Sequence, residues 1–381
     1  MKIFITSIAV AIACLLGSAC SRTGTADDEF EDVELADTVT HHASYLTIAR
    51  MSDGTARVDI SDPWNRGEYL GRYLLVHRDS LLPEDIESDV TVIRTPVERA
   101  AVFSSVHTAA MDELGAIGSL AAVADAAYFP AADTVAALLA AGRVADVGQS
   151  TLPSAEKLAV SGAEILLRSP MQGAAAMQLP RGVVPLEMAD YMEISPIGRA
   201  EWILLLGELF GKQDLAQAIF TDVIDEYSAL VYKASQSTSP SPTVLMETEV
   251  SGVWYVPAGG SYQARIIADA GAIYPWSDTD GSGSLPLSFE AVVDKALDAD
   301  LWLVRSYGYE TSASTLKALN PRYSRFKALR QGNIYSCNSA ERLIFNDIAF
   351  HPEKVLADYV AIFHPDAMPG YELKYFRKSG K

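Results

Sequence analysis

Aromatic, methionine and polar side chains that could bind a small molecule follow the apolar strand patterns of this chain. Open α/β sheets bind ligands beyond the carboxyl ends of their strands, and such sites combine aromatic walls with a few polar groups. The residues predicted to contact a ligand are Ser105, His107, Tyr128, Phe129, Gln149, Met171, Gln172 and Tyr191 in the first half, and Trp254, Tyr255, Trp276, Arg305 and Tyr307 in the second. Arg168 and Arg305 are the cations that an anionic ligand would use.

For some of these side chains, a structural role is the alternative to ligand contact. His107 could cap a helix, Trp254 could fill a core, and each arginine could pair with an acid on a neighbouring strand. The sequence contains no His-Glu-x-x-His, Gly-x-Ser-x-Gly or Cys-x-x-Cys motif and no dinucleotide-binding glycine pattern. We therefore expect a binding protein rather than an enzyme, with no catalytic residues, no cofactor and no metal site of its own.

One helix-and-strand pattern, which could position these residues, occurs once in each half of the chain. Ser154-Ala-Glu-Lys-Leu leads to Gly162-Ala-Glu-Ile-Leu-Leu-Arg-Ser, and Ser288-Phe-Glu-Ala-Val leads to Asp298-Ala-Asp-Leu-Trp-Leu-Val-Arg-Ser. Each copy has a serine N-cap and an acid in the first helical turn. Each then enters an apolar run typical of a parallel strand buried on both faces. The repetition predicts two α/β lobes with a ligand cleft between them.

The N-terminal residues predict an exported lipoprotein. A lysine at position 2, an apolar run over 3–16 and the small residues before Cys20 are typical of a signal peptide over 1–19. Cys20 would then carry the lipid; an ordinary cut near Ala19 and an uncleaved span are the alternatives. Residues 20–43 are polar and acidic, and we expect a flexible tether. The protein would be anchored by lipid alone on a membrane facing the periplasm, or at the cell surface.

The composition excludes nucleic acid as a partner. The chain has 49 acidic and 30 basic residues and a net charge of −19, whereas phosphate binding needs a basic face. After processing, with Cys20 lipidated, Cys337 is the one cysteine left as a free thiol, and it is expected to be a small buried residue.

The remaining patterns divide the chain into segments. Alternating apolar residues predict a β-rich extension over 44–95, followed by a first lobe over 96–194 and a second over 240–375. Ser195 as N-cap and Pro196 in the first turn begin a helical pattern that continues over 195–234. A break at Gly211 is the alternative to one continuous helix. The predicted class is therefore α/β, with two three-layer α/β/α lobes joined by one long backbone helix and a β-rich N-terminal extension.

The order of these segments, with several short strings, resembles a known family. The strings are Arg99-Ala-Ala-Val-Phe-Ser-Ser-Val-His, Ala145-Asp-Val-Gly and Ile266-Ile-Ala-Asp-Ala-Gly-Ala. Over about 95–365 the chain is similar to the helical-backbone substrate-binding proteins of ABC importers (cluster A, class III). The resemblance implies a monomer that captures a metal chelate, foremost a ferric siderophore, and delivers it to a permease and its ATPase. Cobalamin and haem are the alternative ligands.

The chain departs from this family at two positions that concern the permease. Family members present an exposed glutamate in each lobe, but this chain has Gln172-Gly-Ala in the first and Gln263 and Arg265 in the second. The alternative is therefore a surface or adaptor binding lipoprotein that is not coupled to a permease.

Overall fold

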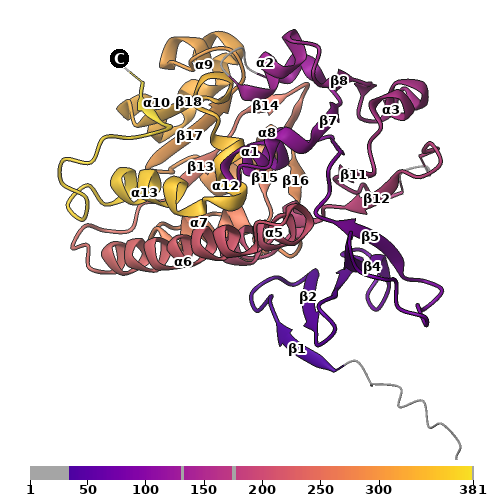
Figure 1. The fold of residues 1–381 in the computed structure, drawn as a ribbon. Coiled ribbons are helices and arrows are strands. Elements are labelled where there is room, and N and C mark those ends of the chain that lie inside the picture. Colours follow the sequence, from indigo (N-terminus) through magenta and orange to yellow (C-terminus); the bar gives the residue numbers. More distant parts are fainter. Residues whose placement is uncertain (1–33, 130–132, 174–176, 380–381) are drawn as a thin grey trace, which may run out of the picture. The chain divides into compact units, whose positions relative to one another are not determined.

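The computed structural model describes residues 34–129, 133–173 and 177–379 (Figure 1). The predicted signal peptide, Cys20 and the first part of the predicted tether lie outside these residues. Within the described ranges, none of the helices is both long enough and apolar enough to cross a membrane.

The N-terminal extension is one five-stranded sheet in chain order. Alternate side chains such as Ile48, Val58 and Tyr73 point into a core that is shared with the first lobe. The strands are antiparallel except for the parallel last pair. They are β1 (Leu35–Thr38), β2 (Leu46–Met51), β3 (Ala56–Ser61), β4 (Tyr69–His77) and β5 (Thr91–Thr95).

The prediction of a tether through residue 43 is wrong for its last residues, because β1 already belongs to this sheet. Two glutamates of later segments bind the chain that follows β1. Glu201 accepts hydrogen bonds from the backbone N–H groups of His41, His42 and Ala43 at 2.7–2.8 Å. Glu193 accepts those of residues 44 and 45 at 2.8 and 3.0 Å. These contacts are far apart in sequence, so the local composition did not reveal them.

The first lobe contains a parallel sheet in the order β12-β11-β6-β7-β8. Its strands are β6 (Ala100–Val102), β7 (Leu120–Val123), β8 (Ala145–Asp146), β11 (Ile165–Arg168) and β12 (Val184–Glu187), and its helices are α1 (Ser105–Glu113), α2 (Thr134–Ala140) and α3 (Ala155–Ser161). A short hairpin of β9 (Gly148–Gln149) and β10 (Leu152–Pro153) follows β8, and the 3-10 turns are η1 (Ile117–Ser119), η2 (Ala126–Tyr128) and η3 (Asp190–Met192). All five sheet strands end on the same side because they are parallel.

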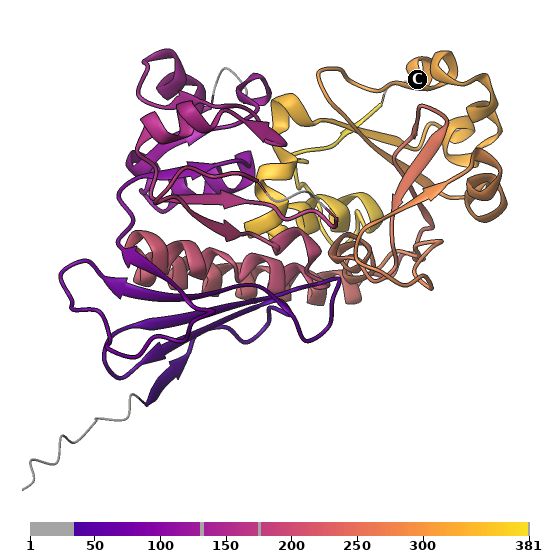
Figure 2. The same cartoon turned by 90° about the vertical axis from the view of Figure 1, so that its right-hand side faces the viewer.

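The second lobe has a separate four-stranded sheet in the order β13-β17-β18-β19, parallel except for β19. The strands are β13 (Val244–Met246), β17 (Leu301–Ser306), β18 (Ile334–Asn338) and β19 (Arg377–Lys378); β14 (Glu249–Val250), β15 (Val253–Pro257) and β16 (Ser284–Leu287) form a small antiparallel sheet. The helices are α7 (Tyr262–Asp269), α8 (Phe289–Ala296), α9 (Ala313–Leu319), η4 (Pro321–Arg325), α10 (Lys327–Gln331), α11 (Ser339–Arg342), α12 (Ile344–Phe350) and α13 (Pro352–Phe363). Figure 2 shows the two lobes side by side.

The repeated sequence pattern forms α3 and β11 in the first lobe and α8 and β17 in the second. Ser154 Oγ accepts the N–H of Lys157 at 3.2 Å, and Ser288 Oγ accepts that of Ala291 at the same distance, so both serines are N-caps. The two strands belong to different sheets. The predicted pair of α/β lobes is thus confirmed. Cys337 is buried in the second lobe as predicted, and burial raises the pKa of its thiol to about 12.

The helical segment between the lobes is interrupted, unlike the continuous helix predicted over 195–234. It consists of α4 (Pro196–Ala200), α5 (Ile203–Phe210) and α6 (Gln213–Ser235). Gly211 ends α5 with a φ of 66°, a left-handed conformation that favours glycine. Apolar periodicity continues past this glycine and favoured one continuous helix, but the break lies at Gly211, the alternative that the sequence offered.

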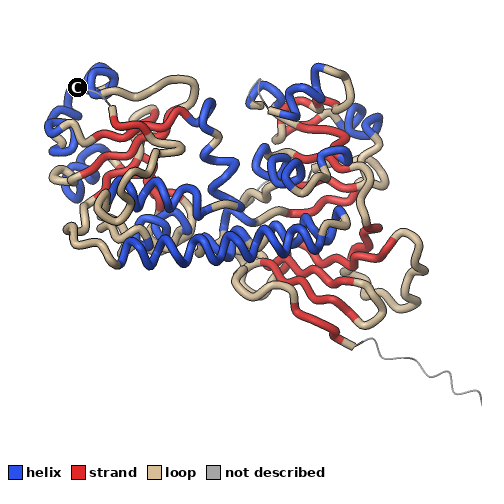
Figure 3. Tube along the Cα trace, turned by 60° about the vertical axis from the view of Figure 1, so that its left-hand side comes forward, coloured by secondary structure: helices blue, strands red, loops and turns tan. Residues whose placement is uncertain are grey.

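The long helix α6 connects the lobes (Figure 3). Its first half contributes Phe220 and Val223 to the core of the first lobe, and its second half contributes Tyr227 and Leu230 to that of the second. In return, Phe350 of α12 packs into the core of the first lobe. The helix α6 therefore contributes side chains to the hydrophobic cores of both lobes.

Candidate functional site

A cavity of about 1250 Å³ lies at the carboxyl ends of the first-lobe strands. Its volume exceeds the roughly 300–1000 Å³ of most small-molecule sites, which indicates a bulky ligand. The lining residues lie after β6, in the β9-β10 hairpin, after β11, at the end of β12, in η3 and in a turn of the extension. They include Phe103, Ser150, Leu152, Arg168, Met171, Gln172, Met177, Gln178, Glu187, Tyr191, Trp64 and Asn65.

Three of the residues predicted to contact ligand line this cavity together. They are Met171 and Gln172, which follow β11, and Tyr191 of η3. The Tyr191 hydroxyl donates a hydrogen bond of 2.6 Å to the carbonyl of Pro170, which holds the start of the loop. Burial, followed by the charges of Asp190 and Glu187, raises the pKa of Tyr191, so the phenol stays protonated as this donor.

Arg168, at the end of β11, does not face the cavity as a free cation. Its Nε donates to Oε1 of Glu187 on the neighbouring strand β12 at 2.8 Å, and its Nη2 also contacts Oε1. Glu187 is only 8% exposed. Its other oxygen, Oε2, has no hydrogen-bond partner among the described residues. Pairing with a neighbouring acid, one of the two roles considered for this arginine, is therefore the arrangement observed.

A turn of the extension forms a wall of the cavity that the sequence reasoning missed. Asp62 accepts hydrogen bonds from the N–H groups of Trp64 and Asn65 at 2.8 and 3.1 Å, and from Asn65 Nδ2 at 2.9 Å. Burial would raise the pKa of Asp62, but these hydrogen bonds outweigh it and the pKa is lowered. None of these residues is among those predicted to contact a ligand. A tryptophan within such a polar turn was the signal available.

Two contacts join the lobes beside the strand ends. Ser105 Oγ, at the start of α1, donates to Asn346 Oδ1 of α12 at 3.1 Å. The rings of Tyr128 and Tyr307 meet edge to face with centroids 6.1 Å apart. Since Tyr128 lies beyond β7 and Tyr307 directly follows β17, the carboxyl ends of the two sheets face each other. Both tyrosines are more than half exposed, and neither they nor Ser105 are among the residues that line the cavity.

His107 lies in a buried ion cluster rather than on the cavity wall. Its Nε2 is 2.9 Å from Asp190 Oδ1, and the second oxygen of Asp190 accepts two hydrogen bonds from Arg199 at 3.0 and 3.1 Å. Burial raises the pKa of Asp190, but the charges of Arg199 and His107 outweigh this and lower it. The Arg199 guanidinium also lies 4.5 Å from the ring centroid of Tyr262 in the second lobe. This cluster links the two lobes and α4.

Three of the residues predicted in the second lobe are enclosed by protein. Trp254 is fully buried, is stacked on Trp302 with centroids 5.7 Å apart, and donates from Nε1 to a carbonyl at 2.9 Å. Trp276 packs on Tyr274 in the same core. Arg305 is paired with Glu247, and its guanidinium lies 5.2 Å from a phenylalanine ring centroid. The two tryptophans therefore lie in the hydrophobic core and the arginine in an ion pair, which are the structural roles considered as alternatives.

The other predicted residues lie outside the cavity lining. Gln149 is exposed on the short hairpin, Phe129 is half-buried against the core of the first lobe, and Tyr255 is exposed on β15. All of these residues follow or occupy strands, as do Met171 and Tyr191. Their position in the tertiary structure, which the strand pattern does not give, keeps them out of the cavity lining.

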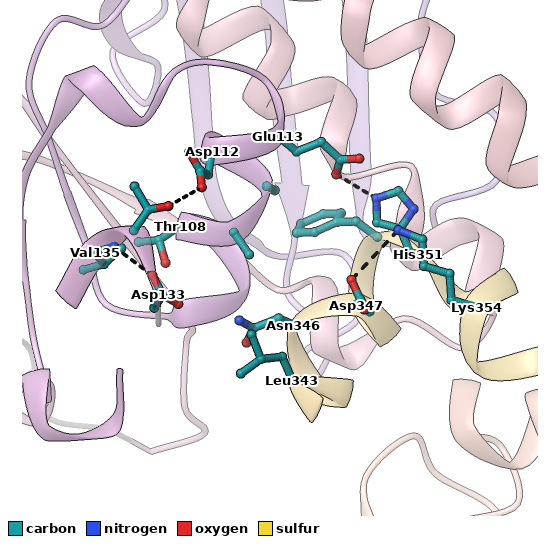
Figure 4. Close-up of a pocket in the computed structure, with 14 residues that line it drawn as sticks. Thr108, Asp112, Glu113, Asp133, Val135, Leu343, Asn346, Asp347, His351 and Lys354 are labelled. Atoms are coloured by element: carbon teal, nitrogen blue, oxygen red, sulfur yellow. Dashed lines mark hydrogen bonds and ion pairs between the residues drawn. The ribbon is translucent and has the colours of Figure 1, made fainter. Parts of the chain in front are cut away.

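A second, smaller cavity of about 560 Å³ lies between α1 and α2 of the first lobe and α12 and α13 (Figure 4). It contains none of the residues predicted to bind ligand. His351 lies beside it: Nε2 is 2.7 Å from Glu113 of α1, and Nδ1 is 3.0 Å from Glu353 of α13. Burial lowers the pKa of His351, but the hydrogen bonds and charges of both glutamates outweigh it and raise the pKa to about 9. His351 is thus a buried imidazolium between the lobes.

The two-lobe region of the chain is similar to known proteins. A family model described as "Periplasmic binding protein" matches residues 101–341. An uncharacterized lipoprotein of Methanocaldococcus jannaschii is 28% identical over 322 residues, which cover 81% of this chain and 76% of the relative. A second uncharacterized lipoprotein of that organism is 23% identical over 202 residues, covering 52% of this chain and 51% of the relative.

Solved structures show the same fold. A periplasmic heme binding protein from Pseudomonas aeruginosa has a TM-score of 0.55 and 17% identity, covering 74% of this chain and 98% of its own. Helicobacter pylori CeuE with Ni(II) bound has a TM-score of 0.56 and 12% identity, covering 74% and 88%. An ABC-type Fe³⁺-hydroxamate transport protein from Saccharomonospora viridis has a TM-score of 0.50 and 18% identity, covering 67% and 93%.

Proposed function

The chain belongs to the periplasmic binding protein family, and from this premise we propose that it captures a metal chelate, foremost a ferric siderophore, for an ABC importer. The observation that carries the proposal is the large cavity at the carboxyl ends of the first-lobe strands. Its aromatic and methionine side chains suit a bulky complex with apolar ligand groups. The structural neighbours named for heme, Ni(II) and Fe³⁺-hydroxamate support this ligand class.

The second lobe would complete the site by covering the bound chelate. Tyr307 already meets Tyr128 across the lobes, and Tyr309, two residues further on, is exposed. Phe345, whose ring lies 5.2 Å from the Arg305 guanidinium, is exposed as well. A chelate seated in the cavity would then contact one or more of these rings. The shared helix α6 restrains large hinge motion between the lobes. We therefore expect small shifts of the side chains around Tyr128 and Tyr307 on ligand binding rather than wide closure of the lobes.

Delivery would take place at a membrane to which the protein is anchored by lipid on Cys20. The lipoprotein description of the two Methanocaldococcus jannaschii relatives supports this anchor. The partners would be a permease and its ATPase, and the protein would act as a monomer. Cobalamin and haem are the alternative chelates.

The test is direct binding by the mature protein purified in detergent. Native mass spectrometry against a ferric tris-hydroxamate, a ferric tris-catecholate, haem and cobalamin is expected to show one complex of 1:1 stoichiometry. Quenching of tryptophan or tyrosine fluorescence should give a dissociation constant at or below the micromolar range. Should none of the four ligands bind in that range, the proposal would be wrong.

A binding lipoprotein without a permease is the second candidate. One observation favours it: after β11, the described residues 169–173 form no helix and include no acid, where the family presents a docking glutamate. Reconstituted importer assays separate the two functions. Ligand binding without stimulation of ATP hydrolysis by a co-expressed importer would support the adaptor role.

A further inference from the structure

We propose that the N-terminal extension is part of the binding site, and that the ligand is a neutral or cationic chelate with an apolar face against Trp64 and a hydrogen-bond donor toward Glu187. This inference rests on the proposed function and specifies its ligand. It concerns a segment, residues 34–95, that lies outside the matched family region.

The first argument is that the extension presents Trp64 as a fixed wall. The turn is closed by three hydrogen bonds to Asp62, so its backbone is held beside the cavity. The sheet behind it is joined to the first lobe where the Tyr73 hydroxyl donates to the carbonyl of Pro185 at 3.0 Å. Glu193 and Glu201 bind the start of the extension. A half-buried indole held in this way offers a preorganised surface for a ligand.

The second argument is that Glu187 retains acceptor capacity at the cavity wall. Arg168 uses both of its contacting nitrogens on Oε1, and Oε2 is enclosed without a partner among the described residues. Leaving such an oxygen unsatisfied costs free energy. The last torsion of a glutamate is soft. A turn of the carboxylate that keeps one oxygen on Arg168 would bring the other toward a donor on the ligand. A hydroxyl, an amide N–H or an ammonium group would serve.

The third argument is the charge of the wall. The charged residues that line the cavity are Asp62, Arg168 and Glu187, of which Arg168 and Glu187 are paired. The unbalanced charge is therefore negative, on a chain whose net charge is −19. Like charges disfavour the approach of a polyanion. A ferric tris-catecholate, which carries several negative charges, should bind less well than a neutral or amine-bearing ferric tris-hydroxamate.

The experiment compares these three chelates by isothermal titration calorimetry on the full mature protein. The wild type is expected to bind the amine-bearing and neutral tris-hydroxamates at least about tenfold more tightly than the tris-catecholate. Trp64→Ala should weaken hydroxamate binding by about tenfold. Glu187→Gln should weaken the cationic complex by about tenfold and the neutral complex less. Tyr69→Ala, an exposed aromatic of the same extension that does not line the cavity, should leave binding unchanged.

The outcomes separate this inference from the function on which it rests. Tight chelate binding that is unaffected by Trp64→Ala and Glu187→Gln overturns the inference and leaves the proposed function intact, as does preferential binding of the tris-catecholate. Failure of all chelates to bind overturns both. Because Trp64 lies in a surface turn, its variant is expected to keep the wild-type thermal transition, and this is measured in parallel.

Discussion

Replacing His351 by glutamine should make the stability of the protein lose most of its dependence on pH between 6 and 9. His351 is buried between Glu113 of the first lobe and Glu353, with Asp347 and Lys354 also close by. Its pKa in the folded protein is about 9, against an ordinary value of 6.5 for histidine. A folded pKa that is raised stabilises the native state below the unfolded pKa, and this contribution is lost as the pH rises through 9.

The magnitude follows from these two pKa values. Linkage gives about 3 kcal/mol of stabilisation at pH 6, about 2 kcal/mol at pH 7.5 and less than about 0.5 kcal/mol at pH 9. His351→Gln removes this term. The difference in free energy of unfolding between wild type and variant should therefore shrink by on the order of 2–3 kcal/mol from pH 6 to pH 9. A constant difference caused by lost packing would remain.

The assay is urea unfolding of both proteins at pH 6, 7.5 and 9, followed by circular dichroism at constant ionic strength. His77→Gln is the matched control, because His77 is more than half exposed on the extension. It should differ from wild type by less than about 0.5 kcal/mol at every pH. A wild-type to His351→Gln difference that stays constant across the three pH values would refute the buried imidazolium.

Three further predictions concern other parts of the structure. Glu201→Gln should lower the free energy of unfolding by about 2–3 kcal/mol, since three backbone N–H groups lose a charged acceptor. Limited proteolysis of this variant should cut the chain before residue 46 sooner than in wild type. Equal rates of cleavage would contradict this prediction. Trp254→Ala should lower the free energy of unfolding in urea by about 3–5 kcal/mol. Trp254→Phe should leave chelate affinity within about twofold of wild type, because the ring is enclosed by protein. A large loss of affinity in Trp254→Phe would place Trp254 in the binding site. A double-mutant cycle of Tyr128→Ala and Tyr307→Ala should give a coupling of about 0.5–1.5 kcal/mol, and zero coupling in urea unfolding would show that the two rings do not meet in solution.

The elements with strong local signals could be predicted from the sequence. The pairs α3–β11 and α8–β17 were found because a serine cap, an early acid and an apolar run are adjacent in the chain. The interruption at Gly211 was foreseen only as the alternative to a continuous helix, because apolar residues keep their spacing on both sides of it. The left-handed backbone of that glycine shows that the break is real.

The composition of the cavity could be predicted less well than the fold. Its position at the strand ends followed from topology, and Met171, Gln172 and Tyr191 were identified on that basis. The predicted cleft between the lobes differs from this cavity, because the described residues that line it all belong to the first lobe and the extension. Which aromatic residues are enclosed depends on tertiary packing, so Trp254 could not be distinguished from Trp64 by residue type. The contribution of Trp64 requires the extension to be held by Glu193 and Glu201. Those contacts join residues far apart in the sequence.

The location of a bound chelate tests the central claim most directly. A crystal of the mature protein with a ferric chelate, measured at the iron absorption edge, would locate the metal by anomalous scattering. We predict one iron site in the large cavity of the first lobe, with the chelate against Trp64, Met171 and Tyr191. Iron found instead in the cavity beside His351, or at neither position in crystals of a protein that binds the chelate in solution, would contradict the account.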